Sequence, residues 1–271
     1  MSGTPGEVIY QARLTESGLA LEDSTALCSE YVATGDWDAV KLRALKENLL
    51  GKGSRSRISK LLRAVERRVL GATPPLDRPL AIARFLAAES KVTAAAKVQL
   101  LLVLTIREDR AFGDAFHALI MPNASGTASK VLGPEAIPDF LSRAGRDRPE
   151  VARWSEQTRA RWAQGFRLVL REAGFVASSD RSASVEMRPL VVRDEVVSFL
   201  AHLIADGGVS GWSILRHETI ANLFPTESDA LRAARALNDR GWWSFAQSGH
   251  IMELRRNHAS LEEWLAHGLG I

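Results

Sequence analysis

Residues 46–71 carry a dense group of basic side chains, and the most direct chemistry of such a group is the binding of a polyanion. The segment holds eight Lys or Arg residues against two Glu residues, a formal charge of +6, whereas the whole chain of 271 residues carries +3. Concentrated positive charge of this kind favours a partner such as nucleic acid. The basic residues are Lys46, Lys52, Arg55, Arg57, Lys60, Arg63, Arg67 and Arg68.

The spacing of the apolar residues in this segment predicts an amphipathic helix. On a wheel drawn at about 100° per residue, the apolar side chains of residues 58–69 fall on one side, and Lys60, Arg63 and Arg67 fall on the other. The turn at residues 51–54 precedes the helix, so its amides are placed to meet a phosphate group. The pattern therefore predicts a basic ridge that projects outward.

A solvated helix face is the alternative interpretation of this ridge. Solvated faces usually mix both signs of charge, whereas Glu66 is the only carboxylate close to these basic residues in the sequence. We therefore expect contact with DNA through Lys52, Ser54, Arg55, Ser56, Arg57, Lys60, Arg63 and Arg67.

The pair Gly51-Lys52 does not belong to a nucleotide-binding loop. A Walker motif needs a glycine five residues before the Gly-Lys pair, where this chain has Lys46, and a Ser or Thr directly after the lysine, where it has Gly53. The pair also lies between two predicted helices and not after a buried strand. The sequence thus excludes a phosphate-loop NTPase.

Further arginines in the second half of the chain are candidates for additional DNA contacts. One pair lies on a predicted helix at residues 155–173, opposite its Trp162–Phe166 face, and the others lie where a winged helix meets a groove and its phosphates. The predicted helix at 226–240 also carries carboxylates, which offset its positive charge. A module that contacts protein is therefore the alternative there. The candidates are Arg167, Arg171, Arg232, Arg235, Arg255 and Arg256.

The residue types that carry catalysis are scattered. The six histidines have no metal-ligand spacing, no GxSxG elbow occurs, and the single cysteine, Cys28, lies on an apolar helical stripe. We therefore predict a protein that is not an enzyme and that has no catalytic residues, no metal and no cofactor.

The periodicity of the chain predicts a mainly α, two-domain helical protein. The polar, Gly- and Pro-containing stretch at residues 142–150 is the best boundary, which gives an N-terminal helical domain at 1–147 and a C-terminal winged-helix-like domain at 148–271. The helix at 155–173 is followed by two β-prone runs, FVAS and SVEMR, which predict a hairpin.

The last eighty residues predict helix-turn-helix and winged-helix elements. Three helices, at 191–206, 213–224 and 226–240, precede a hairpin centred on residues 247–249, and Thr226 with Asp229 resembles a capping box. The most apolar run, 98–106, has about half the length of a membrane span, and no signal peptide is visible. With one cysteine and no span, we expect a cytoplasmic protein that does not bind membranes.

Two blocks of sequence resemble the BrxA family of the BREX phage-defence systems. The resemblance covers roughly residues 8–70 and rests on a Y-x-A-x-L opening and an N-L-L-G-K-x-S block. The matching residues are Tyr10, Ala12, Leu14, Gly18, Leu19, Asn48, Leu49, Leu50, Gly51, Lys52, Ser54 and Arg57. The remainder agrees in helical character and in an LREAGF helix end at 170–175.

The resemblance implies a small, largely helical, cytoplasmic DNA-binding accessory protein without known catalytic activity. Its partners would be duplex DNA and other BREX subunits, namely a methyltransferase, an ATPase and a phosphatase-like protein. We therefore expect binding of duplex DNA mainly through phosphate contacts. The alternatives are a scaffold that docks other BREX subunits and an RNA-binding, antitermination-like helical module.

Overall fold

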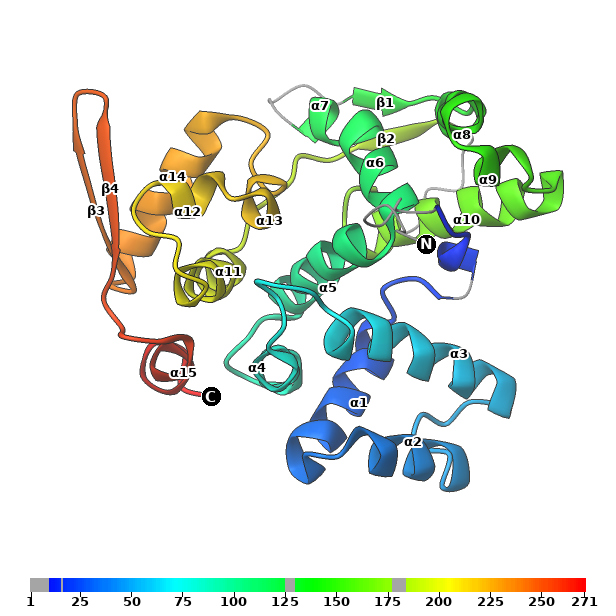
Figure 1. Cartoon of the computed structure of the whole chain (residues 1–271), viewed down its shortest axis with the longest axis horizontal. Helices are drawn as coiled ribbons and strands as arrows, with labels where there is room; N and C mark the ends of the chain where they lie inside the picture. Colours follow the sequence, from blue (N-terminus) through cyan, green and yellow to red (C-terminus); the bar gives the residue numbers. More distant parts are fainter. Residues whose placement is uncertain (1–9, 16, 125–129, 177–183) are drawn as a thin grey trace, which may run out of the picture. The chain divides into compact units, whose positions relative to one another are not determined.

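A computed structural model describes residues 10–15, 17–124, 130–176 and 184–271. The protein is mainly α-helical, as the sequence predicts (Figure 1). The chain divides into two compact units, one formed by Met1–Leu19 with Thr105–Pro189 and the other by Ala20–Leu104 with Leu190–Ile271. The boundary predicted after residue 147 lies inside the first unit, and it stays a prediction because compactness does not test whether either half folds alone.

The first half of the Ala20–Leu104 and Leu190–Ile271 unit is a helical bundle. Its elements are α1 (Leu21–Thr34), α2 (Trp37–Lys46), α3 (Arg55–Val65), the π-helical turn η2 (Glu66–Leu70), α4 (Pro79–Ala87) and the beginning of α5 (Ala94–Glu108). Helix α1 packs along α4 and also contacts α2 and α3. The core residues Leu27, Val40, Leu61 and Ile82 are completely buried, so apolar burial holds these helices together.

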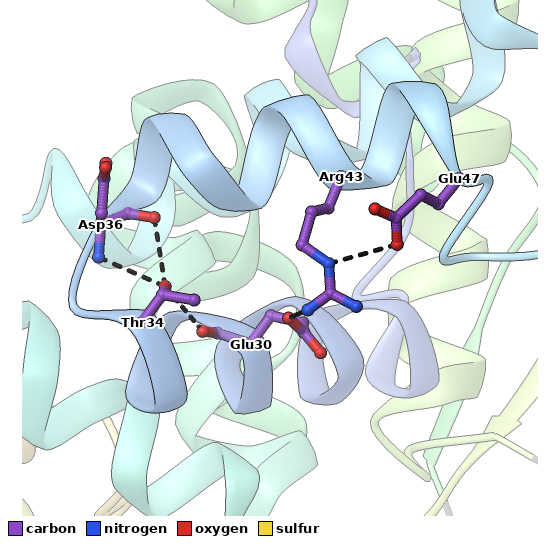
Figure 2. A network of polar contacts seen from close by, with 5 residues as sticks. All are labelled: Glu30, Thr34, Asp36, Arg43 and Glu47. Atoms are coloured by element: carbon purple, nitrogen blue, oxygen red, sulfur yellow. Dashed lines mark hydrogen bonds and ion pairs between the residues drawn. The ribbon is translucent and has the colours of Figure 1, made fainter.

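A polar network joins α1 to α2 at the surface (Figure 2). Helix α1 ends at Gly35, whose φ of 66° suits glycine, and the Asp36 side chain then accepts hydrogen bonds from the first amides of α2. The Arg43 guanidinium pairs with Glu30 of α1, and its Nε lies 3.2 Å from Oε2 of Glu47. Exposed pairs of this kind contribute about 0.5 kcal/mol each, so the network orients α2 more than it stabilises it.

The second half of this unit has helices followed by a hairpin. The elements are α11 (Asp194–Asp206), α12 (Ser213–Arg216), α13 (Glu218–Ala221), α14 (Glu227–Asp239), β3 (Trp243–Ser248), β4 (Ile251–Arg256), α15 (Leu261–Glu263) and the π-helical η3 (Trp264–Leu269). Strands β3 and β4 pair antiparallel from Trp243↔Arg256 to Ser248↔Ile251. The predicted hairpin and the Thr226–Asp229 capping box are confirmed.

The helix predicted at residues 213–224 is divided into α12 and α13. His217 lies between them with an extended backbone, and its side chain caps α13 by accepting a hydrogen bond from the Thr219 amide at 3.3 Å. Apolar periodicity runs through this break, because Ile214, Leu215 and Ile220 are all buried. The hydrophobic pattern therefore does not reveal the interruption.

A buried histidine connects α11 to the hairpin and to the C-terminal turn. His202 is completely buried, its ring stacks on Trp264 at 5.1 Å, and its Nδ1 donates to the Ser198 carbonyl oxygen at 2.8 Å. The Trp243 indole nitrogen donates to the Ser198 hydroxyl at 3.1 Å. Burial lowers the pKa of His202 from 6.5 to about 4, so the folded protein holds this ring in the neutral form.

The other unit is built around α10. Its elements are η1 (Arg13–Thr15), the end of α5, α6 (Arg110–Leu119), α7 (Met121–Ala124), β1 (Lys130–Leu132), α8 (Ala136–Asp147), α9 (Pro149–Ala152), α10 (Glu156–Glu172) and β2 (Val185–Met187). Trp162, Phe166 and Val169 form the predicted apolar face of α10 and are completely buried. A Cβ at Gly165 would lie 2.4 Å from the Leu14 carbonyl oxygen, so only glycine allows η1 to lie against α10.

The partner of the strand at residues 185–187 differs from the one that the sequence predicts. Strand β2 pairs antiparallel with β1, with Val131 opposite Glu186, and not with the run that begins at Phe175. One backbone hydrogen bond, from the Arg188 amide to the Phe175 carbonyl oxygen at 2.7 Å, connects the two predicted runs. Residues 177–183, which include the predicted turn SSDRSA, lie outside the described residues. A three-residue strand is too short for periodicity to reveal, so the sequence pattern does not indicate β1.

The buried His202 makes the stability of the protein depend on pH. The neutral ring is favoured in the folded state, so its full contribution is present above about pH 6.5 and is lost as the pH falls toward 4. The loss reaches about 3 kcal/mol. We expect urea unfolding of the wild type to show this decline and His202→Leu to reduce it. Burial also lowers the pKa of His117, but this residue is present in both proteins and affects both pH profiles equally. Parallel pH profiles for the wild type and the variant would therefore contradict the role of His202.

Candidate nucleic-acid interface

Helix α3 begins at a capped residue and buries one face. The Ser54 backbone is extended, and its hydroxyl oxygen accepts a hydrogen bond from the Arg57 amide at 3.3 Å. Ile58, Leu61, Leu62 and Val65 are at most 4% exposed. This buried stripe is the one that the apolar spacing predicts, so the opposite face of the helix points outward.

The outward face of α3 carries the basic ridge. Arg55, Arg57 and Arg63 are exposed, and Lys60 and Arg67 are half-buried on the same helix and its η2 extension. Within the described residues, Arg55, Arg57 and Lys60 make no ion pair. Their charges are therefore available to an external anion. We call Ser54, Arg55, Ser56, Arg57, Lys60, Arg63 and Arg67 the α3 surface.

The turn between α2 and α3 is held by side chains, and Lys52 is one of them. Asn48 has a left-handed backbone with φ of 51°, and its side-chain oxygen accepts a hydrogen bond from the Lys52 amide at 2.9 Å. The Lys52 ammonium lies 2.8 Å from a carboxylate oxygen of Asp23 on α1. The structure therefore places this predicted DNA contact in an internal ion pair, which fixes the position where α3 begins.

The carboxylate closest to the ridge in sequence is neutralised from α2. Oε1 of Glu66 lies 3.3 Å from the ammonium nitrogen of Lys41, which also pairs with Asp38 at 2.6 Å. The hydrogen bond to Asp38, followed by the one to Glu66, raises the pKa of Lys41. Arg68 is 4% exposed and lies on the buried side of η2, so it does not belong to the outward surface.

The two arginines predicted on α10 are turned toward their own unit. Arg167 is half-buried, and its guanidinium donates to the Pro134 carbonyl oxygen at 3.4 Å. Arg171 is also half-buried, and its Nε is shielded from solvent. Both stay predictions as DNA contacts, and both are half-buried, whereas Arg55, Arg57 and Arg63 of the α3 surface are exposed.

The predicted contacts in the C-terminal half are already matched by polar partners. Three arginines pair with carboxylates, Arg232 with Asp229 at 3.2 Å, Arg255 with Glu253 at 2.6 Å and Arg256 with Asp206 at 2.6 Å. The fourth, Arg235, donates to the Gln247 side chain at 3.4 Å. Residues 190–271 hold seven Arg and no Lys against ten Asp or Glu, a formal charge of −3. These arginines are therefore matched by partners in their own half of the unit, which has a net negative charge.

The sequence pattern predicts no DNA contact for four exposed arginines that lie on α8, on α10 and directly after α9. The helical wheel of residues 155–173 places Arg167 and Arg171 opposite the apolar face and so predicts these two as contacts instead. The basic run SRAGRDRPEVARW is the signal that could reveal them, but its glycine and proline also indicate a domain boundary. These side chains are Arg143, Arg146, Arg153 and Arg161, and none has a hydrogen-bond or ion-pair partner among the described residues.

Among the described residues, the cysteine is buried and no cluster of metal ligands is formed. Cys28 is 1% exposed, and burial raises the pKa of its thiol to about 12, so it is a poor nucleophile. No group of three or more His, Cys, Asp or Glu residues within the described ranges could hold a metal ion. Among these same residues, no helix combines the length and apolar character that crossing a bilayer requires.

The fold and the surface together define a mainly α-helical protein with an outward-facing basic helix. The model of the BrxA family matches residues 8–203, which is more than half of the chain. The chain therefore belongs to the BrxA family, and the resemblance in its sequence is confirmed. Membership implies a component of a BREX phage-defence system, a class of defence accessory protein and not a known enzyme family.

One solved structure supports the fold independently. A crystal structure of an uncharacterized protein from Magnetospirillum magneticum superposes with a TM-score of 0.57 at 16% sequence identity, covering 80% of this chain and 97% of that one. At this identity the likeness concerns the fold alone. A search of the curated proteins found no match.

The cap of α3 gives a testable prediction about how the surface is positioned. Ser54→Ala removes the acceptor of the Arg57 amide, so we expect the free energy of unfolding to fall by about 1 kcal/mol and the Arg57 amide to exchange faster with solvent. Ser56→Ala is the matched control, because Ser56 is exposed inside the helix and alanine is favoured there. Urea unfolding and hydrogen exchange measure both variants, and equal losses of stability for both would contradict the capping role.

Proposed function

We propose that this protein is a non-catalytic DNA-binding accessory component of a BREX-type phage-defence system, and that its α3 surface holds duplex DNA mainly through phosphate contacts. The single observation that carries the proposal is the outward face of α3, where Arg55, Arg57 and Lys60 have no carboxylate partner among the described residues. Membership of the BrxA family supports the defence role.

The shape of the α3 surface fits a DNA backbone. Ser56, Lys60, Arg63 and Arg67 follow one another at intervals of three or four residues, so they form one line along the helix. Helix α3 and its η2 extension cover residues 55–70, a length of about 24 Å. Lys60, Arg63 and Arg67 occupy about 10 Å of that length, so these three cations can meet neighbouring phosphates of one duplex.

Reversal of charge on the α3 surface tests this function. The variant Lys60/Arg63/Arg67→Glu removes three cations and introduces three anions, so we expect the affinity for a short duplex to fall by at least about tenfold at low salt. The slope of log K against log salt should become less steep by about 0.9 for each phosphate that the variant no longer neutralises. Fluorescence anisotropy over a salt titration measures both quantities. Absence of duplex binding by the wild type at low salt would overturn the proposal.

A second function is favoured by one observation, the charge of residues 190–271. This region carries −3 and pairs its arginines with its own carboxylates, so it offers duplex DNA little net attraction. We infer that it forms a winged-helix module that docks another BREX subunit, while α3 contacts DNA. Electrostatic complementarity between proteins uses such mixed surfaces, since alternating charges select a partner.

The variant Arg232/Arg235/Arg255→Glu separates the two roles. We expect its duplex affinity and salt slope to stay close to wild type, and its co-purification with another BREX subunit to weaken. The same anisotropy assay and a pull-down with the purified subunits provide the comparison. If the duplex affinity falls as far as it does for the α3 reversal, the C-terminal arginines act on DNA instead.

Competition between duplex DNA and structured RNA at one salt concentration tests the RNA-binding alternative, and we expect duplex DNA to compete better.

A further inference from the structure

A second group of cations without ion-pair partners among the described residues lies in the compact unit that does not contain α3. Arg143 and Arg146 are on α8, Arg153 follows α9, and Arg161 is on α10, and all four are exposed. Helix α8 contacts both α9 and α10, and Figure 1 shows the three helices close together. We call these four arginines the α8–α10 surface.

One buried indole holds the three segments in place. Trp162 of α10 is completely buried, stacks on Phe140 of α8 at 6.4 Å, and lies 6.3 Å from the Trp154 ring, which follows α9. The backbone of Gly145 approaches Ala152 so closely that an added Cβ would contact it at 3.6 Å. The arginines therefore project from a packed scaffold, which reduces the cost of ordering them when an anion binds.

The remaining charged side chains of these segments are mostly engaged internally. The Glu150 carboxylate accepts a hydrogen bond from the Tyr10 amide at 2.9 Å, and the Arg148 guanidinium lies over the Tyr10 ring at 5.3 Å. The Arg159 guanidinium donates to the Val151 carbonyl oxygen at 3.2 Å. Glu172 accepts a hydrogen bond from the Leu19 amide, and Asp139, Asp147 and Glu156 are the other exposed carboxylates of these segments. Residues 136–172 hold eight Arg against five Asp or Glu, a formal charge of +3, so the segments are net positive.

We propose that the α8–α10 surface binds the phosphate backbone of duplex DNA independently of α3. Guanidinium groups suit this ligand because their paired N–H donors match two phosphate oxygens at once. Four of them on one scaffold, with no ion-pair partner among the described residues, offer several such contacts. The inference rests on the proposed function for the identity of the ligand, but it concerns a different site in a different compact unit.

The test starts from the variant in which the α3 surface is already reversed. Lys60/Arg63/Arg67→Glu should retain measurable binding to a short duplex at low salt, because the α8–α10 surface remains. Adding Arg143/Arg146/Arg161→Gln to this variant should lower the remaining affinity by at least about tenfold and flatten the salt slope by about 2 to 3, since each phosphate that is no longer neutralised accounts for about 0.9. Lysine at the same three positions should retain most of the binding.

Controls separate this inference from a folding defect and from the proposed function. The four arginines are exposed, so circular dichroism and thermal unfolding should match the wild type. Arg188→Gln removes one exposed arginine of the same unit outside the surface and should leave the salt slope unchanged. If the α3 reversal alone abolishes binding, or if the glutamine variant behaves like its parent, the inference is overturned while DNA binding through α3 stands. Preference of the α3-reversed protein for structured RNA over duplex DNA would overturn it as well.

Discussion

The division of α3 into a buried apolar face and an outward basic face is the constraint on which the proposed interface depends. Burial of Ile58, Leu61 and Val65 fixes the rotation of the helix about its axis. Because 3.6 residues make a turn, that rotation determines the direction of Lys60 and Arg63. Burial of one such apolar side chain contributes about 1.5–3 kcal/mol, which exceeds the cost of holding neighbouring like charges in water. The hydrophobic effect therefore orients the electrostatic surface.

The connections around α3 serve the same purpose. Asn48, the Lys52–Asp23 pair and the Ser54 cap define where the helix begins, and the Lys41–Glu66 pair neutralises the carboxylate that would weaken the ridge. The sequence pattern predicts Lys52 as a DNA contact, and in the structure its ammonium pairs with Asp23. The four arginines of the α8–α10 surface, which the pattern does not predict as contacts, are exposed. Charge in the sequence indicates a capacity to bind anions, and the partners of each side chain determine which charges remain available.

Much of the fold and part of the site can be predicted from the sequence. The amphipathic stripe of α3, the apolar face of α10 and the β3–β4 hairpin follow from local periodicity and turn chemistry. The β1–β2 pair, the break at His217 and the buried position of His202 depend on contacts between segments far apart in sequence. For the same reason, local spacing does not show that Arg167 contacts Pro134 or that Arg256 pairs with Asp206.

Electrostatics distinguishes three regions of this BrxA-family chain. Residues 20–104, which include α3, carry a formal charge of +5 from 14 Lys or Arg against nine Asp or Glu, whereas residues 190–271 carry −3 from seven Arg against ten. The remaining residues, 1–19 and 105–189, therefore carry +1, given the chain total of +3. Four exposed arginines of that last unit gather on and beside α8, α9 and α10. This distribution favours contact with DNA from the first region and protein docking through the acidic one.

The salt dependence of wild-type binding to a short duplex tests the central claim most directly. Contacts between cationic side chains and phosphates release counterions, so the account predicts that log K falls linearly with log salt, with a slope of about −0.9 for each phosphate contacted. For a surface formed by several arginines and lysines, that slope should be about −3 or steeper. A slope close to zero, or no binding at low salt, would contradict the claim that α3 holds DNA by its phosphates.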